Sequence, residues 1–160
     1  MSGSVTVSIQ KDKCTGCGLC RLACSFDKNG VFNPSASRIW ILDGDESGFY
    51  PNICRNCEEA PCLDACPAGA LVRRREDGYI LLNSEKCVGC NMCVMVCPFC
   101  AIGRMGDRNF KCDTCNHLEK CARICPHGAI QFEKPAHSSA NKRRKLAGLL
   151  TAKTGGKEKW

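Results

Sequence analysis

One short stretch of this 160-residue chain restricts its possible folds more than any other. Four cysteines follow one another at steps of three, three and four residues, and a proline comes directly after the last. These residues are Cys87, Cys90, Cys93, Cys97 and Pro98. Two-residue spacers let a short loop wrap around one site, so the first three thiolates are expected to converge there.

This spacing is the C-x2-C-x2-C-x3-C-P signature of bacterial ferredoxins. In the signature, three cysteines bind iron corners of one [4Fe–4S] cube, and the fourth binds the neighbouring cube. A single run of this kind therefore needs a partner run that supplies the reciprocal ligand.

Three partner runs are present. One repeats the spacing without the proline, and the other two lengthen the middle spacer to four and five residues. They consist of Cys14, Cys17, Cys20 and Cys24; of Cys54, Cys57, Cys62 and Cys66; and of Cys112, Cys115, Cys121 and Cys125. Four runs give sixteen ligands, enough for four [4Fe–4S] clusters, and Cys100 is the seventeenth cysteine.

Such a cysteine density also suits a disulfide scaffold or zinc sites. Disulfides are disfavoured because Met1–Val5 lacks an apolar secretory leader, one cysteine is left over, and disulfide frameworks need no ordered pattern. C-x2-C pairs suit tetrahedral zinc, but zinc does not require a third cysteine at the same short step. The pattern therefore favours iron–sulfur clusters, without which we expect the chain to be unstable.

Short apolar strands follow the cysteine runs and indicate an α+β fold. Turn residues between them predict hairpins within residues 67–82 and 101–111, and a short helix is expected at Arg21–Phe26. The last strand, within Pro126–Phe132, has no following partner. The only other unpaired strand is Val5–Ile9, at the opposite end of the chain.

Pairing of these two end strands predicts a nested arrangement of two bacterial-ferredoxin-like dicluster units. Residues 1–48 and 108–133 would form an outer unit from runs one and four. Residues 49–107 would form an inserted unit from runs two and three. Residues 134–160 would remain as a basic C-terminal tail.

The charge of the chain is divided between body and tail. Residues 1–133 contain 15 basic and 15 acidic residues, whereas residues 134–160 contain 8 basic and 1 acidic. Each oxidised cluster with its four thiolates contributes a charge of about 2−. The loaded body is then strongly negative, and the tail is either a solvated basic end or an arm that docks on a partner or a second copy.

All sixteen cysteines, in this order, make the chain resemble the four-cluster iron–sulfur electron-transfer subunits of molybdenum and tungsten oxidoreductases, carbon monoxide dehydrogenases and formate-linked hydrogenases. The resemblance covers about residues 5–133. Within that family, residues 30–34 and 37–39 look like the small subunits that accompany tungsten aldehyde oxidoreductases. This likeness favours a tungsten enzyme as the partner.

The resemblance also implies which cysteines share a cluster. Cluster a would be held by Cys14, Cys17, Cys20 and Cys125; cluster b by Cys112, Cys115, Cys121 and Cys24; cluster c by Cys54, Cys57, Cys62 and Cys97; and cluster d by Cys87, Cys90, Cys93 and Cys66. No ligand is replaced, so four [4Fe–4S] clusters are expected rather than any three-iron cluster.

The resemblance implies a non-catalytic subunit of a cytoplasmic, anaerobic oxidoreductase complex, and the sequence contains no catalytic constellation. It would relay single electrons between a tungsten or molybdenum pterin enzyme and an acceptor such as a flavin protein or ferredoxin. One alternative is a free polyferredoxin that binds its partners transiently. Another is a zinc-structured nucleic-acid-binding protein, although no recognition fold or aromatic platform supports nucleic-acid binding.

Three further expectations complete the sequence analysis. Cys100 is interpreted as a buried free thiol rather than a ligand or nucleophile. His127 is expected to face solvent. No apolar stretch of membrane length and no twin-arginine leader is present, so no direct membrane span is expected.

Overall fold

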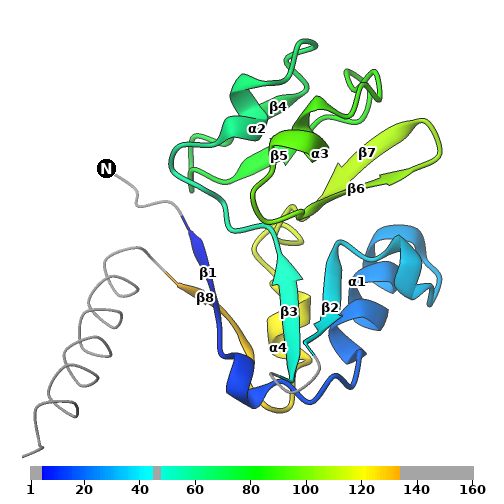
Figure 1. Cartoon of the computed structure of the whole chain (residues 1–160), viewed down its shortest axis with the longest axis vertical. Coiled ribbons are helices and arrows are strands. Elements are labelled where there is room, and N and C mark those ends of the chain that lie inside the picture. The colour runs from blue at the N-terminus through cyan, green and yellow to red at the C-terminus, as the bar shows by residue number, and fades with distance from the viewer. Residues whose placement is uncertain (1–4, 45–47, 134–160) are drawn as a thin grey trace, which may run out of the picture.

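The computed structural model describes residues 5–44 and 48–133, so the predicted basic tail lies outside the described residues (Figure 1). Within these ranges the chain forms eight short strands and four α-helices. The strands are β1 (Thr6–Ile9), β2 (Ile39–Asp43), β3 (Phe49–Ile53), β4 (Leu71–Arg73), β5 (Ile80–Leu82), β6 (Ile102–Met105), β7 (Arg108–Lys111) and β8 (Ile130–Glu133). The helices are α1 (Leu19–Asn29), α2 (Pro61–Asp64), α3 (Met92–Val96) and α4 (Lys120–Arg123), with single 3-10 turns at Lys11–Lys13 and Pro34–Ala36.

The strands pair two by two into antiparallel ribbons. The order is β1 with β8, β2 with β3, β4 with β5, and β6 with β7. The predicted pairing of the first and last strands is confirmed, with Val7 opposite Phe132 and Ile9 opposite Ile130. The two predicted hairpins within residues 67–82 and 101–111 are also confirmed.

The ribbons and helices form two lobes (Figure 1). The first lobe contains β1, β8, β2, β3, α1 and α4, in the lower half of the view, and the second contains α2, α3 and the β4–β5 and β6–β7 hairpins above it. Each lobe has a small core in which aliphatic side chains pack beside cysteines. Ile39, Ile53 and Ile130 are buried in the first lobe, and Leu71 and Ile80 in the second.

The boundaries of the proposed nested units lie within two hairpins. The proposed boundaries, at residues 48 and 107, fall in the turns of the β2–β3 and β6–β7 hairpins. Because a hairpin spans each boundary, backbone hydrogen bonds tie the two units together there. The division into an outer and an inserted unit stays a proposal.

A proline after the fourth cysteine limits the length of the helix in three of the four runs. Runs two, three and four place a proline directly after the fourth cysteine, and a proline disfavours helical geometry in the residue before it. Helices α2, α3 and α4 accordingly span only four or five residues. Run one has no such proline, so α1 continues past Cys24 until Gly30 ends it in a left-handed conformation (φ 69°). The helix expected at Arg21–Phe26 is thus confirmed and is longer than predicted.

One backbone turn is common to all four cysteine runs. The residue before the second cysteine has a positive φ in each run, and these residues are Gly16 (72°), Asn56 (52°), Gly89 (67°) and Thr114 (60°). The left-handed conformation turns the loop sharply between the first two thiols. At Gly89 the chain also approaches the turn between β6 and β7 closely, because an added Cβ would lie 2.0 Å from the backbone oxygen of Asp107.

Gly89→Ala therefore introduces both backbone strain and a steric clash. We expect it to destabilise the anaerobically prepared protein by about 3 kcal/mol or more. Gly106→Ala is the matched control, since Gly106 also has a positive φ (63°) but an added Cβ would meet nothing within 4 Å. The control is expected to cost about 1 kcal/mol, and equal losses of thermal stability in the two variants would contradict the clash.

Candidate metal centres

Three cavities are each lined by four of the predicted ligand cysteines. Site a is lined by Cys14, Cys17, Cys20 and Cys125; site b by Cys24, Cys112, Cys115 and Cys121; and site d by Cys66, Cys87, Cys90 and Cys93. Each of the three cavities is thus lined by an equivalent set of four thiols, so the three cavities suit one kind of group. Across residues 5–44 and 48–133, no three His, Cys, Asp or Glu side chains are arranged to hold a single metal ion.

The remaining predicted ligands meet at site c. The pKa of the Cys62 thiol is raised to about 11, first by burial and then by the nearby Cys54, Cys97 and Cys57 thiols. The pKa of Cys57 is likewise raised by burial and then by Cys54 and Cys97. The four predicted cysteines of site c are thus close enough to influence one another electrostatically, and their assignment to one cluster stays a proposal.

Each site draws three cysteines from one run and the fourth from another. Cys125 of run four lines site a, while Cys24 of run one lines site b. Cys66 of run two lines site d, and Cys97 of run three lies beside the run-two thiols. The assignment of these cysteines to individual clusters stays a proposal.

The fourth cysteine of every run accepts a backbone hydrogen bond. In the three runs with a Cys-Pro step, the donor is the N–H group four residues later. These bonds run from Ala70 to Cys66 (3.2 Å), from Ala101 to Cys97 (3.4 Å) and from Ala129 to Cys125 (3.4 Å). In run one, where α1 continues, the Arg38 N–H donates to Cys24 instead (3.3 Å).

These donors favour the thiolate form of cysteine. Desolvation raises the pKa of the Cys66 thiol, but the N–H groups of Leu71, Ala70 and their neighbours together outweigh it, so the pKa lies below its ordinary value. Thiolate is the form that binds iron. Backbone donors to sulfur also tune the potential of a bound cluster.

Other thiols are held in dry surroundings. Burial raises the pKa of Cys20 to about 11 and that of Cys112 to about 12. Such thiols are protonated at neutral pH unless a metal displaces their protons. Four thiols around a small, largely apolar cavity are the donor set of a [4Fe–4S] cluster, so the residues present fit that group.

The prediction that Cys100 is buried is wrong, because its side chain is exposed. Cys100 has a φ of 48°, and the equivalent residues of runs two and four are Gly69 (55°) and Gly128 (61°). A left-handed residue ends the turn after each Cys-Pro step, and at this position the side chain is directed to solvent. His127 is exposed, as expected.

The sequence analysis did not predict the left-handed conformations of Asn56 and Thr114. Thr114 is a β-branched residue with a positive φ, a rare combination that signals local strain. Its N–H donates to the Cys112 sulfur (3.4 Å) and its hydroxyl to the Asp113 carbonyl (2.6 Å), which hold it in place. Its position before the second cysteine of a run was the available signal.

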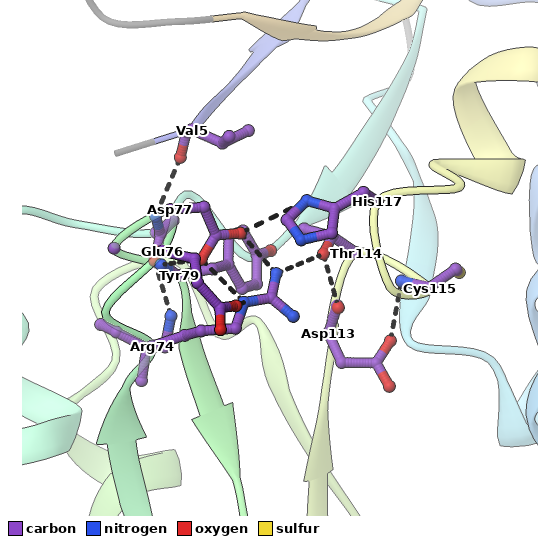
Figure 2. Close-up of polar contacts among 12 residues, drawn as sticks. Val5, Arg74, Glu76, Asp77, Tyr79, Asp113, Thr114, Cys115 and His117 are labelled. Atoms are coloured by element: carbon purple, nitrogen blue, oxygen red, sulfur yellow. Dashed lines mark hydrogen bonds and ion pairs between the residues drawn. The ribbon is translucent and has the colours of Figure 1, made fainter. Parts of the chain in front are cut away.

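A polar network joins the two lobes (Figure 2). Arg74 Nε donates to Asp77 Oδ1 (2.8 Å), and Arg74 Nη2 reaches Thr114 Oγ1 (3.4 Å). The Val5 N–H donates to the Asp77 carbonyl (3.2 Å), and His117 Nδ1 lies 3.6 Å from Asp77 Oδ2. The Arg74 guanidinium lowers the pKa of the Asp77 carboxyl to about 2, against the opposing effect of burial.

Two dicluster lobes with four sets of four cysteines define an iron–sulfur protein of the ferredoxin type. The chain belongs to the family described as "4Fe-4S dicluster domain", which matches residues 46–135. The family described as "4Fe-4S binding domain" matches residues 7–27, around run one. The sixteen cysteines of the four runs fit four [4Fe–4S] clusters.

Several characterised proteins are similar over most of this chain. The polyferredoxin-like subunit of aliphatic sulfonate oxidoreductase from Pyrococcus furiosus is 36% identical, over 76% of this chain and 71% of its own. Electron transport protein HydN of Escherichia coli is 34% identical, over 84% and 93%. The beta subunit of NADH-dependent phenylglyoxylate dehydrogenase from Aromatoleum evansii is 35% identical over 79% of this chain, which matches only 29% of that longer subunit.

Among the helices of residues 5–44 and 48–133, none has the length and apolar character needed to cross a bilayer.

Replacing Cys100 by glycine is expected to stabilise the protein by about 1 kcal/mol, because glycine adopts the left-handed conformation without strain. Gly69→Ala, at the equivalent turn of run two, is the matched control and is expected to destabilise by a similar amount. Anaerobic thermal unfolding and iron analysis measure both effects. Loss of iron from Cys100→Gly would show that Cys100 is a ligand after all.

Asp77→Asn is expected to destabilise the protein by about 2 kcal/mol at pH 7, since the Arg74 guanidinium lowers the Asp77 pKa to about 2. A lowered pKa means that this stabilisation is complete above about pH 4 and is lost as the pH falls toward about 2. The difference from the wild type should therefore be constant between pH 8 and 5, measured by denaturant unfolding.

Asp107→Asn is the control for this variant, because the Asp107 side chain is 90% exposed and should contribute little. A wild-type advantage that changed between pH 8 and 6 would contradict the assignment of the effect to the Arg74–Asp77 pair.

Proposed function

We propose that this chain is a non-catalytic electron-transfer subunit that relays single electrons between a catalytic oxidoreductase subunit and an acceptor protein. A bound [4Fe–4S] cluster takes up and releases one electron at a time. The observation that carries the proposal is the gathering of sixteen cysteines into four reciprocal sets. The named relatives support it, since two of them are subunits of oxidoreductases.

We propose the following ligands: Cys14, Cys17, Cys20 and Cys125 at site a; Cys112, Cys115, Cys121 and Cys24 at site b; Cys54, Cys57, Cys62 and Cys97 at site c; and Cys87, Cys90, Cys93 and Cys66 at site d. The cavities and the electrostatic neighbours of the thiols support these sets.

Contacts between the sites suggest the order of the relay. Cys20 of site a is among the thiols that, after burial, raise the pKa of Cys121 at site b. Cys54 of site c similarly acts on Cys112 of site b. Sites c and d are linked because runs two and three exchange their fourth cysteines. The proposed relay therefore runs from site a through sites b and c to site d.

The two end sites reach the surface. Cys17 of site a and Cys90 of site d are exposed, whereas Cys112 and Cys121 of site b are buried. Exposed apolar side chains surround the site d loop, including Val88 (68% exposed) and Met95 (78% exposed). Entry of electrons at one end and exit at the other fits this arrangement.

The catalytic partner that we propose is a tungsten or molybdenum pterin enzyme, with a tungsten aldehyde oxidoreductase favoured, in a cytoplasmic, anaerobic complex. The acceptor would be a flavin protein or a ferredoxin. The support is the family resemblance and the loop at residues 30–39. A free polyferredoxin is the second candidate, favoured by the match to HydN, which is named only as an electron transport protein.

Anaerobic purification of the tagged full-length chain from its native cells tests the proposal. We expect about sixteen irons per chain, visible absorbance that bleaches with strong reductant, and co-purification of a pterin-containing subunit. Removal of residues after Ala136 shows whether the tail contributes to docking. Iron-loaded protein that elutes alone would favour the free carrier, and zinc in place of iron would overturn both candidates.

A further inference from the structure

Tyr79 connects the two lobes through its side chain. The residue lies just before β5, in the second lobe, but its side chain belongs to the core of the first lobe, together with Ile53 and Cys112. It is completely buried, with 0% of its surface exposed. A tyrosine in such a core normally has a partner for its hydroxyl group.

The Tyr79 hydroxyl has no hydrogen-bond partner of normal geometry. Few other buried side-chain polar atoms in the described residues lack such a partner. Two cysteines of different sites nevertheless lie near it. Burial raises the pKa of the hydroxyl well above 10, and Cys112 of site b and Cys54 of site c raise it further. The hydroxyl therefore packs among thiols of two proposed sites, but none of these thiols forms a hydrogen bond of normal geometry with it.

Contacts of the ring and of the adjacent backbone fix the position of Tyr79. The buried Lys111 places its Nζ 4.9 Å from the ring centroid and donates to the carbonyl oxygens of Ile80 and Cys112. On the backbone, the Tyr79 N–H donates to Asp77 Oδ1 (3.1 Å), and the next N–H, of Ile80, donates to Asn56 Oδ1 (2.9 Å). Asp77 belongs to the network that joins the lobes (Figure 2).

We propose that the Tyr79 hydroxyl is a shared hydrogen-bond donor between sites b and c. In the iron-loaded protein the hydroxyl donates one hydrogen bond, either to the sulfur of Cys112 or to that of Cys54. The acceptor is the sulfur that carries more negative charge. The inference rests on the proposed function, because it requires clusters at both sites. Tyr79 acts through the ligand sulfurs and is a positioning residue.

The chemistry of sulfur explains the choice of acceptor. A protonated thiol is a weak acceptor, whereas an iron-bound thiolate is anionic and accepts a strong, charge-assisted hydrogen bond. The bond strengthens when the cluster gains an electron, so it raises the reduction potential of that cluster. Because one hydroxyl faces two sulfurs, it can turn toward the site that is being reduced without transferring its proton.

Tyr79→Phe removes the hydroxyl and retains the buried ring. We expect the reduction constants of two of the four clusters to fall about tenfold, which is about 59 mV for one electron. Potentiometric titration followed by electron paramagnetic resonance measures each cluster in the anaerobically loaded chain. Tyr50→Phe is the matched control, since Tyr50 is the only other tyrosine in the sequence. Its hydroxyl accepts a hydrogen bond from Arg55.

A second measurement changes the donor without removing it. In the Tyr50→Phe background, fluorotyrosine can replace only Tyr79, and ring fluorine makes the hydroxyl a stronger donor. We expect the same two potentials to rise, opposite to their fall in Tyr79→Phe. A purely structural role for Tyr79 would not reverse sign between the two substitutions.

The outcomes separate this inference from the proposed function. Four clusters with potentials unchanged in both substitutions, or an equal shift of all four, would overturn the role of Tyr79 and leave the electron-transfer proposal standing. If Tyr79→Phe loses iron, the fluorotyrosine protein alone decides the matter. A wild-type chain that never holds four clusters would overturn the proposed function itself.

Discussion

The reciprocal placement of the fourth cysteine is the constraint on which the rest of the structure depends. No run surrounds a site alone, since sites a and b exchange Cys125 and Cys24, and sites c and d exchange Cys97 and Cys66. Each exchange holds two loops close together. The short strands and small cores support these loops, and cysteines occupy much of the space that aliphatic side chains fill in other small domains.

Cysteine spacing predicted the iron–sulfur cofactor, because spacing is a local property that directly limits where thiols can meet. The ligand runs, the confirmed hairpins and the pairing of β1 with β8 all followed from residues visible in the sequence. The grouping of cysteines into four sets needed the family resemblance as well. Spacing within a run does not determine which other run supplies the fourth thiol.

Features that depend on backbone conformation or on the junction between lobes were not predictable. Asn56 and Thr114 adopt conformations typical of glycine, and Cys100 occupies a left-handed position that directs its thiol outward. Residue type alone favours a buried site for a free cysteine, and here the turn overrides that preference. In the sequence, Tyr79 looks like an ordinary strand residue. Only its tertiary position places its hydroxyl between two sites.

The pairing of β1 with β8 has a consequence for how the protein is made. Synthesis on the ribosome proceeds from residue 1, so the proposed ligands of sites c and d are complete once Cys97 has emerged. Sites a and b need Cys125 and Cys121, and β1 must wait for the final strand before it has a partner. The proposed ligands from the middle of the chain are thus all synthesised before the set that begins with Cys14 is complete.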